Sequence, residues 1–584
     1  MSFKPNPLFR SDAYKIGHKR MLASGTTKLY GTWIPRSLKY FPGSIKKILS
    51  VGQQLTIKWL HDEFKENFFE QPKDKVCKDF TKDMSLMLGL PYDGKHFEEL
   101  HDLGYLPIRV KSLPEGIETN PNVPHMTFVN TVDGFAWLTL FLETIISAAS
   151  WKMPTSATLA LQLRRNVVEW VMKTCPEMAW LIPYLCHDFS ARGLDPFSMI
   201  TSGLGHATCF RGSDSLIVIP AARYYYGEPE DEVVINSVNA SEHSVSTTKI
   251  FTVGEKQMII DWLKEFPTGI LSIVADTFDL WKLLLEYIAD PEVKALILAR
   301  DGKLVIRPDS GDPVDIICGL PVYDDNAGEE SIYETYKDGD IFYYLQEDCW
   351  IKFNKDSFES SLREYGENTW DYIDEYYEKV EAPNKAETKG VIEILWDIFG
   401  GTTNEQGYKV LDSHIGAIYG DSINLERQIA IYERLAAKGF AACNVVLGVG
   451  SFTYQFNTRD TAGFAAKGSW FEILEPSPCI KAGKCLETES FKNTPHEGLD
   501  LCTDGCVQEN PHHKTYDIYK DPVTDDGTKK SLKGLIRVNE DGSVKEQCTW
   551  EEEQGGILQT IYENGKFFNQ TTFTEIRERI NNTI

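Results

Sequence analysis

Four short apolar runs of the sequence are each followed at once by a loop of acidic residues or glycines. Continuous apolar runs are typical of buried parallel strands, because helices cover both faces of such a sheet. In α/β barrels the loops that follow the strands meet at one end, where reactive groups gather. We therefore expect the four loops to form one site. They are Asp276–Asp279, Arg307–Asp312, Gly420-Asp421 and Gly448–Ser451.

The loops bring together carboxylates, a fixed cation and glycines. Asp276 and Asp309 offer metal ligands, Arg307 offers a cation for phosphate, and backbone N–H groups of a glycine turn can face phosphate oxygens. Carboxylates alone would repel a phosphate, so the mixture predicts a divalent metal between protein acids and an anionic substrate. Mg²⁺ suits this role because it binds one or two carboxylates together with phosphates. Any single Asp after a strand is equally well explained as a helix N-cap.

The spacing of the loops shows where a regular strand-helix period is interrupted. Asp276 and Asp309 lie 33 residues apart, about one strand-helix unit, whereas Asp309 and Asp421 lie 112 apart. The excess falls in residues 321–390, which hold 19 acidic and 7 basic residues, and we interpret it as an acidic insertion. Its many Tyr and Trp residues predict a small folded module rather than a disordered acidic tail.

The composition argues against several classes of function. The chain has 60 Lys plus Arg against 86 Asp plus Glu, a net charge of −26, which disfavours a nucleic-acid or anionic-membrane surface. The insertion carries −12 of this charge, so local arginines can still bind phosphate. The longest apolar stretch, residues 135–151, contains Glu143 and is too short to span a membrane, so we expect a buried helix. Isolated cysteines such as Cys186, Cys209 and Cys443 are typical of core thiols in a reducing compartment, which predicts a cytoplasmic protein.

A second irregular stretch, residues 476–513, is rich in Pro, Gly, Asn and Asp. Its thiols and imidazoles could bind zinc, but the cysteines lack the close spacing of established zinc motifs, so an ordinary surface loop is the alternative. The residues concerned are Cys479, Cys485, Cys502, Cys506, His496, His512 and His513.

Nine short motifs follow one another along the chain. They are Ser11–His18, Leu106–Gly116, His187–Gly193, Phe210–Ser215, Ser241–Ser244, Ile306–Pro313, Tyr419–Asp421, Asn457–Asp460 and Tyr519–Pro522. Each motif alone is a weak signal. In this order, and over nearly the whole chain apart from the two insertions, they resemble the nicotinamide phosphoribosyltransferases of NAD salvage.

The resemblance implies an α/β, type II phosphoribosyltransferase fold. Residues 151–459 would form an α/β-barrel-like catalytic domain that contains the acidic insertion 321–390. Residues 1–150 with 460–584 would form a mixed, largely β domain that contains the insertion 476–513. The implied reaction transfers a phosphoribosyl group from phosphoribosyl pyrophosphate to nicotinamide, giving nicotinamide mononucleotide and pyrophosphate. The implied assembly is a homodimer with two active sites at the subunit interface.

The resemblance assigns the base to residues of both subunits. Phe189 and Tyr14 of the partner subunit would sandwich the pyridine ring. Asp214 would accept a hydrogen bond from the amide of nicotinamide, and Ser237 belongs to the same substrate-binding set. A nicotinate carboxylate would meet like charge at Asp214, and sites built around such a bond reject the wrong analogue by roughly 10⁴-fold.

The resemblance assigns the phosphates to cations, since guanidinium forks match phosphate oxygens. Arg192 and Arg307 would act together with Arg36, Arg459 and Lys467 of the partner subunit. Mg²⁺ and these arginines would stabilise the departing pyrophosphate.

The remaining implied roles belong to the ribose, the metal and an activator. Asp309 would bind the ribose hydroxyls or Mg²⁺, with Asp276 as a second metal ligand. The turns Gly420-Asp421 and Gly450-Ser451 would bind the 5′-phosphate and the ribose. His243 is the position of the family's ATP-linked phosphorylation, which predicts ATP as an activator. The implied catalytic set is His243, Arg307 and Asp309.

One departure from the family pattern and two alternative functions stay open. Ser451 and Phe452 stand where the family has glycines, which puts close backbone approach to the phosphate in doubt at Ser451. A nicotinate phosphoribosyltransferase is the rival enzyme, and Asp214 argues against it. A non-catalytic scaffold on the same fold is the third reading, against which stands the retention of Arg192, Arg307 and the other charged site residues.

Overall fold

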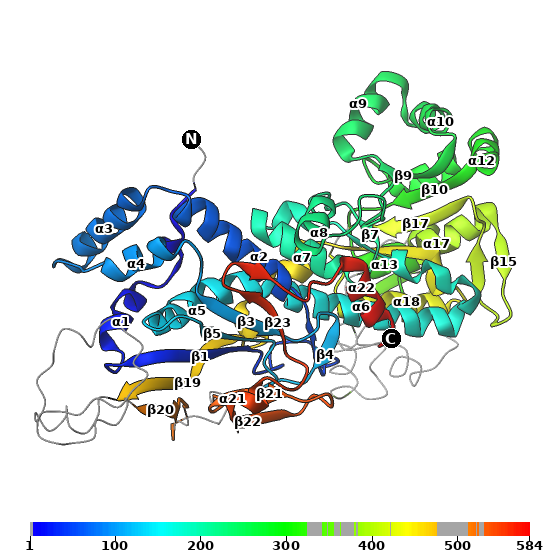
Figure 1. The fold of residues 1–584 in the computed structure, drawn as a ribbon. Helices are drawn as coiled ribbons and strands as arrows, with labels where there is room; N and C mark the ends of the chain where they lie inside the picture. Colours follow the sequence, from blue (N-terminus) through cyan, green and yellow to red (C-terminus); the bar gives the residue numbers. More distant parts are fainter. Residues whose placement is uncertain are drawn as a thin grey trace, which may run out of the picture.

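The computed structural model describes most of the chain. Two sheets dominate it, a parallel one surrounded by helices and an antiparallel one beside it (Figure 1). Asp421 and most of the two insertions lie outside the described residues. The described residues are 4–323, 341–346, 349–354, 363, 379–380, 384–420, 422–475, 512–520, 523–524 and 531–584.

The parallel sheet follows the chain around a barrel. Its strand order is β7-β6-β18-β17-β10-β9-β8. Strands that follow one another in the chain are neighbours except for β7 and β8, and β18, the last in the chain, pairs with β6, the first. A bridge between Gly212 and Asn236 continues the pairing from β7 toward β8. The strands are β6 (Cys186–Asp188), β7 (Gly212–Ser213), β8 (Asn239–Ala240), β9 (Thr268–Val274), β10 (Asp301–Arg307), β17 (Ile415–Tyr419) and β18 (Val445–Val449).

The four apolar runs predicted as buried strands are β9, β10, β17 and β18, and the α/β fold class is confirmed. Most side chains of the predicted runs are buried, as expected where helices cover the outer face of the sheet, and Leu304 and Ile306 of β10 are fully buried. Residues 268–270 at the start of β9 are exposed. The amphipathic pattern ahead of β9 forms a helix, as predicted. The helices of this part of the chain include α7 (Pro196–Ala207), α8 (Val218–Tyr226), α9 (His243–Val253), α10 (Glu255–Glu265), α12 (Pro291–Leu298), α13 (Pro313–Cys318), α17 (Lys385–Phe399) and α18 (Leu425–Ala437).

The antiparallel sheet combines the two ends of the chain, as predicted. Its order is β20-β19-β1-β5-β3-β23-β24. The apolar stretch at 135–151 forms the buried helix α5 (Ala136–Ser150), which packs on β1 and β19. The domain boundaries themselves stay a prediction. The strands are β1 (Thr26–Ile34), β3 (Ile108–Ser112), β5 (Met126–Asn130), β19 (Ala465–Glu475), β20 (His512–Asp517), β23 (Gln559–Glu563) and β24 (Lys566–Phe567).

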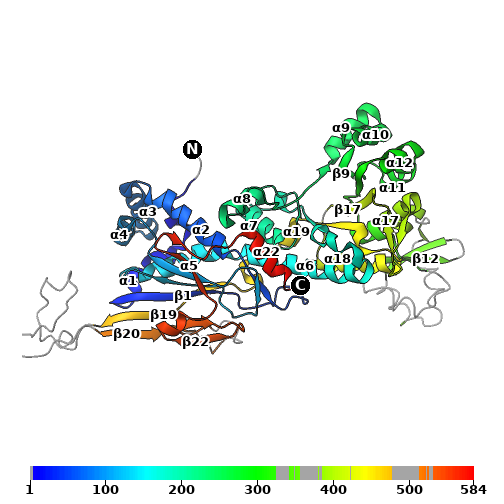
Figure 2. The ribbon, with the colours of Figure 1, turned by 45° about the vertical axis from the view of Figure 1, so that its right-hand side comes forward.

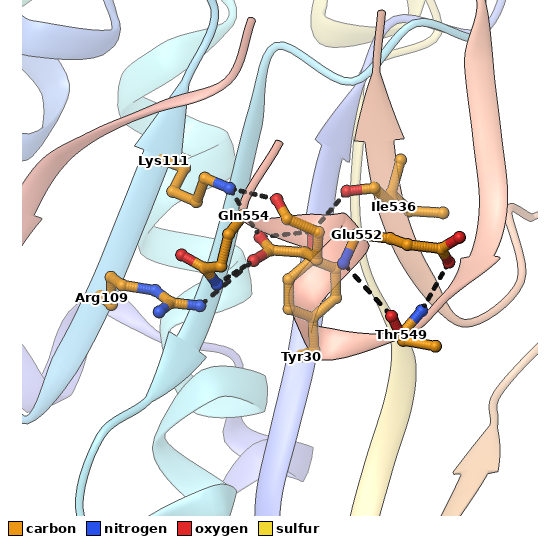
Figure 3. Close-up of polar contacts among 8 residues, drawn as sticks. Tyr30, Arg109, Lys111, Ile536, Thr549, Glu552 and Gln554 are labelled. Carbon is orange, nitrogen blue, oxygen red and sulfur yellow. Dashed lines mark hydrogen bonds and ion pairs between the residues drawn. The ribbon is translucent and has the colours of Figure 1, made fainter. Parts of the chain in front are cut away.

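A buried ionic cluster holds the C-terminal segment on this sheet (Figure 3). Glu553, at the end of α21 (Trp550–Glu553), has a fully buried side chain. Its carboxylate lies 3.1 Å from Nζ of Lys111 and 3.4 Å from Nη2 of Arg109, both on β3. Burial raises the pKa of Glu553 and lowers that of Lys111. Glu553 and Lys111 therefore stabilise each other in the charged form, because an unpaired buried charge is strongly destabilising.

The C-terminal helix α22 (Phe573–Asn581) joins the antiparallel part to the barrel. Arg577 is buried and donates from Nε to the carbonyl of Ala207 at the end of α7 (2.7 Å). The backbone N–H of Thr574 donates to Glu228 after α8 (3.0 Å). Both views place α22 against the barrel helices (Figures 1 and 2). The end of the chain is thus part of the contact between the two sheets.

The described strands of the acidic insertion form a four-stranded sheet, in line with the folded module that its aromatic residues predict. This sheet lies on the side of the barrel away from the antiparallel sheet (Figure 2). The ends of the insertion meet, because the backbone of Gly319 packs directly on that of Gly390 and Thr388. The strands are β11 (Val322–Tyr323), β12 (Ile341–Gln346), β13 (Cys349–Asn354) and β14 (Lys379–Val380).

Other sequence expectations concern cysteines and membranes. Cys186 and Cys209 are buried and Cys443 is partly buried, all with free thiols, as expected for core cysteines. The four cysteines of the zinc hypothesis lie outside the described residues. Among the histidines of that hypothesis, His513 is described, and its Nδ1 lies 3.1 Å from Oε1 of Glu472. Within the described parts of the chain, every helix is too short or too polar to cross a lipid bilayer.

Candidate active site

Asp276 joins two of the predicted loops at the carboxyl end of the barrel strands. Its Oδ2 accepts hydrogen bonds from the backbone N–H groups of Asp309 (2.9 Å) and Ser310 (2.7 Å). The loop after β10 is therefore held by the loop after β9. Oδ1 of Asp276 is buried and has no hydrogen-bond partner. A buried polar atom of this kind needs an explanation, and a bound ligand or ion supplies one.

His243 stands over the two carboxylates from the first turn of α9. Its Nε2 lies 3.6 Å from Oδ2 of Asp309 and 3.8 Å from Oδ1 of Asp276. Its Nδ1 lies 3.3 Å from the hydroxyl of Thr277. The side chain is 44% exposed, so it is open to a ligand from the solvent side. The structure thus brings the predicted metal ligands and the predicted phosphorylation site into one cluster.

Other acidic residues of these loops are helix caps. Asp279 accepts from the backbone N–H of Lys282 (3.0 Å), at the start of α11 (Leu280–Lys282). Asp312 accepts from the N–H groups of Val314 and Asp315 at the start of α13. The N-cap explanation therefore applies to Asp279 and Asp312, whereas Asp276 and Asp309 make no such bond.

Two glycines lie where loops touch. A Cβ on Gly420 would collide with the carboxylate of Asp309, so the loop after β17 lies directly on the loop after β10. A Cβ on Gly193 would likewise collide with the side chain of Ser451. Arg192, which is exposed beside Gly193, therefore lies next to the loop after β18. Asp421 was predicted for this site and lies outside the described residues.

Asp214 is held by two donors at the end of β7. Nε2 of His187 lies 2.9 Å from its Oδ1, and the hydroxyl of Ser237 donates to the same oxygen. Partial burial acts to raise the pKa of Asp214, but the hydrogen bonds from His187 and Ser237 and the charge of Arg307 outweigh it, and the net shift is downward. Asp214 is therefore an ionised acceptor at neutral pH. The ring of Phe189 lies beside His187, with ring centroids 4.6 Å apart.

Arg307 and Ser272 carry further unpaired polar atoms. Arg307 donates from Nη2 to the carbonyl of Ser241 (3.1 Å), while its Nε is buried without a partner. The hydroxyl of Ser272, on β9, is also buried without a partner. Sequence reasoning missed Ser272, although a serine inside an otherwise apolar strand run was the available signal. Oδ1 of Asp276 and Nε of Arg307 are thus two buried polar atoms without a hydrogen-bond partner at the carboxyl ends of neighbouring barrel strands.

The other predicted cations lie elsewhere, around a cavity of about 1090 Å³ on the antiparallel part. Tyr14 is 66% exposed there. Among the described residues, those of the barrel mouth do not line this cavity, so one chain does not bring the two predicted groups together in one pocket. The same cavity is also lined by Lys520 and Lys533, to which the sequence alone assigned no role. The predicted residues that line the cavity are Tyr14, Arg36, Arg459 and Lys467.

Ser451 adopts an ordinary backbone conformation. It begins the short helix α19 (Ser451–Gln455), and Gly450 before it is extended, with φ −85° and ψ −178°. No left-handed geometry demands glycine at 451. Phe452 is 49% exposed and, with Ser451 and Arg427, lines a second cavity of about 500 Å³. The side chain of Phe452 therefore lines this second cavity beside the Gly450-Ser451 turn and does not fill the turn.

The donor set at Asp276 and Asp309 fits Mg²⁺. Both groups are carboxylates, they belong to adjoining loops, and one buried oxygen of Asp276 is unused. Mg²⁺ takes one or two protein carboxylates and completes its shell with water and substrate phosphates. A full protein cage is not needed, and no cluster of three or more His, Cys, Asp or Glu suited to a metal occurs among the described residues.

A parallel barrel whose mouth combines paired carboxylates, arginines and glycine turns is the architecture of an enzyme that acts on a phosphorylated substrate. The chain belongs to the nicotinate phosphoribosyltransferase (NAPRTase) family, which matches residues 184–475.

Several relatives align over almost the full chain. A nicotinamide phosphoribosyltransferase of Acinetobacter baylyi is 35% identical over 99% of this chain and 98% of its own length. One of Xanthomonas campestris pv. campestris is 26% identical over the same shares. Among solved structures, human nicotinic acid phosphoribosyltransferase is 15% identical, with a TM-score of 0.47 over 98% of this chain and 92% of that chain.

Proposed function

We propose that this enzyme transfers a phosphoribosyl group from phosphoribosyl pyrophosphate to nicotinamide, giving nicotinamide mononucleotide and pyrophosphate in NAD salvage. The observation that carries the proposal is the carboxylate of Asp214, held ionised by His187 and Ser237 at the barrel mouth. The names of the relatives from Acinetobacter and Xanthomonas support the same reaction.

Asp214 selects the amide over the acid. Its Oδ1 accepts from His187 and Ser237, which orients the carboxylate so that Oδ2 can accept from an amide N–H₂. Nicotinate would place a second carboxylate against the first and offers no donor in return. Asp214 would then lose its partner in the bound complex, and sites built around such a hydrogen bond discriminate by roughly 10⁴-fold. Phe189 supplies one aromatic face for the ring.

Transfer needs no protein nucleophile, because the pyridine nitrogen attacks C1 of the ribose as pyrophosphate departs. Positive charge builds on the ribose and negative charge on the leaving group. Arg192 and Arg307 are fixed cations beside the site, and Arg307 is held by the carbonyl of Ser241. In this proposal Asp309 binds the ribose hydroxyls, and the turns at Gly420 and Gly450-Ser451 bind the 5′-phosphate. Mg²⁺ bound at Asp276 and Asp309 would neutralise charge on the pyrophosphate.

The rival is the acid-specific reaction that names the family. Initial rates are measured with nicotinamide and with nicotinate, each with phosphoribosyl pyrophosphate and Mg²⁺. We expect kcat/KM to favour nicotinamide by several orders of magnitude. Preference for nicotinate would overturn the assignment, and no mononucleotide from either base would favour the scaffold alternative. Omission of Mg²⁺ in the presence of a chelator should abolish turnover.

The active site is shared between two subunits of a homodimer in this proposal. Support comes from the separation of the predicted residues within one chain, since Tyr14, Arg36, Arg459 and Lys467 line a cavity apart from the barrel mouth. A second copy can supply them to the mouth, as an isologous interface places each patch against its counterpart. The exposed ring of Tyr14 is available for that contact.

ATP acts as an activator through His243. The imidazole is partly exposed and lies beside the carboxylates at which a metal-bound nucleotide would sit. His243→Gln removes the phosphate acceptor and should abolish the stimulation of turnover by ATP, measured as the ratio of rates with and without it. An unchanged ratio would reject the role. We also place the enzyme in the cytoplasm, in line with its free core thiols.

A further inference from the structure

Asp188 is a buried carboxylate that the proposed chemistry does not use. It is the last residue of β6 and its side chain is fully buried, so it cannot touch a substrate. It stands immediately before Phe189 in the chain. Burying a carboxylate is costly unless hydrogen bonds satisfy it, so its partners indicate what it does.

The carboxylate of Asp188 binds both loops that carry the base site. Oδ1 accepts from the backbone N–H of Ser190 (2.9 Å), which closes the turn that carries Phe189. Oδ2 accepts from the hydroxyls of Ser213 (3.2 Å) and Ser215 (2.6 Å), which flank Asp214 on either side. The main chain adds a parallel link, because the N–H of Asp214 donates to the carbonyl of Asp188 (3.0 Å).

We infer that Asp188 is a positioning residue for base recognition, which fixes the stacking residue Phe189 relative to the amide acceptor Asp214. The inference rests on the proposed function. The three serines that bind Asp188 are themselves buried, so solvent cannot replace the carboxylate as their partner. A small relative shift of the two loops would separate the ring contact from the amide contact. Misplacement by about 1 Å can cost on the order of 10²-fold.

The test is Asp188→Asn, which keeps the shape and replaces one acceptor oxygen by a donor. The amide cannot accept from the N–H of Ser190 and from both serine hydroxyls at once. We expect KM for nicotinamide to rise about 10- to 100-fold, with KM for phosphoribosyl pyrophosphate unchanged. The advantage of nicotinamide over nicotinate should fall as well, because Asp214 is no longer held in place.

A matched control comes from Glu115, another fully buried carboxylate. It accepts from the N–H groups of Gly52 (2.7 Å) and Gln54 (2.6 Å) and from the hydroxyl of Tyr226 (3.0 Å), at the start of α2 (Gln53–Phe64). Glu115→Gln should change the melting temperature while leaving both KM values as in the wild type. It thus reports what loss of a buried carboxylate does outside the base site.

Ser215→Ala provides a second variant that removes one donor and leaves the carboxylate in place. Its effect on nicotinamide KM should not add to that of Asp188→Asn in the double variant, because both remove the same hydrogen bond. Wild-type kinetics in Asp188→Asn, or an equal change in both KM values, would overturn the positioning role. Lack of turnover by the wild-type enzyme would instead overturn the proposed function, so the two failures are distinguishable.

Discussion

Nε2 of His187 lies 2.9 Å from Oδ1 of Asp214. The contact joins the strand that leads to Phe189 with the loop that presents the amide acceptor. It is reinforced by the hydroxyl of Ser237 on the same oxygen. The carboxylate is therefore oriented and ionised, as the proposed hydrogen bond to an uncharged amide requires.

Asp214→Asn should weaken discrimination between the two bases. The asparagine keeps a hydrogen-bonding side chain but loses the negative charge that repels nicotinate. We expect kcat/KM for nicotinamide to fall about 10- to 100-fold, while kcat/KM for nicotinate rises or stays unchanged. Steady-state rates with both bases measure the ratio. A ratio equal to that of the wild type would contradict the role of the charge.

The pH dependence of nicotinamide binding follows from the same residue. The pKa of Asp214 is lowered below its usual 3.8, so its carboxylate is ionised above that pH and is lost as an acceptor only as pH falls through the lowered value. KM for nicotinamide should therefore be flat between pH 8 and about 5. A steep rise in KM near neutral pH would show that another group controls the base site.

Mixed dimers should test whether each active site uses two subunits. One variant carries Asp214→Ala at the barrel mouth, and the other carries Lys467→Ala in the cavity on the antiparallel part. Each alone should be inactive or nearly so. Coexpression forms hybrids in which one of two sites is intact, and random pairing restores roughly one quarter of wild-type activity. No recovery in purified hybrids would place both residues in the same subunit's site.

Removal of the acidic insertion should leave catalysis intact. Gly319 packs against Gly390, and the N–H of Leu320 donates to the carbonyl of Glu387 (2.8 Å), so the two ends of the insertion are already joined. Lys438 fixes both ends by donating to the carbonyls of Cys318 and Lys389 (2.8 Å each).

The variant replaces residues 324–383 with a short Gly-Ser linker, and closing so short a loop has a small entropic cost. We expect kcat and both KM values within about twofold of the wild type, measured by mononucleotide formation. A folded variant without turnover would show that the insertion takes part in the reaction.

Glu553→Ala should destabilise the antiparallel part strongly. The change leaves Lys111 and Arg109 without their buried partner, at a cost of about 3–5 kcal/mol. Glu552→Ala is the matched control, because its partly exposed side chain accepts from the N–H of Thr549 at the start of α21 and pairs with the exposed Lys545, contacts that together contribute about 1 kcal/mol. Thermal melting of both variants should give the larger loss for Glu553→Ala. Equal losses would show that the buried cluster contributes little.

Local patterns in the sequence determined the strands of the barrel and the loops of the site. The runs that form β9, β10, β17 and β18 are apolar because both faces of a parallel sheet are covered, and this property is visible without any partner strand. The buried helix α5 was also predicted from a continuous apolar run in the sequence. The position of the acidic insertion followed from a break in the spacing of the loops.

The tertiary structure alone decided which acidic residues form the site. Asp279 and Asp312 look like Asp276 in sequence, yet they cap helices, whereas Asp276 binds the loop of Asp309. Whether such an Asp caps its own helix or binds a neighbouring loop depends on where the backbone after the next strand passes. Residues far apart along the chain set that path, and no local pattern records it.

Tertiary structure also showed that the cations which the family resemblance assigns to two subunits lie apart within one chain. Arg307 lies at the barrel mouth, whereas Arg459 and Lys467 line a cavity on the other sheet. Asp188 became visible only through its burial and its hydrogen bonds. The sequence by itself determined the class of chemistry, because nine short motifs in the order of a known family indicate it. The arrangement of the site was decided by long-range strand pairing and burial, which only the folded chain defines.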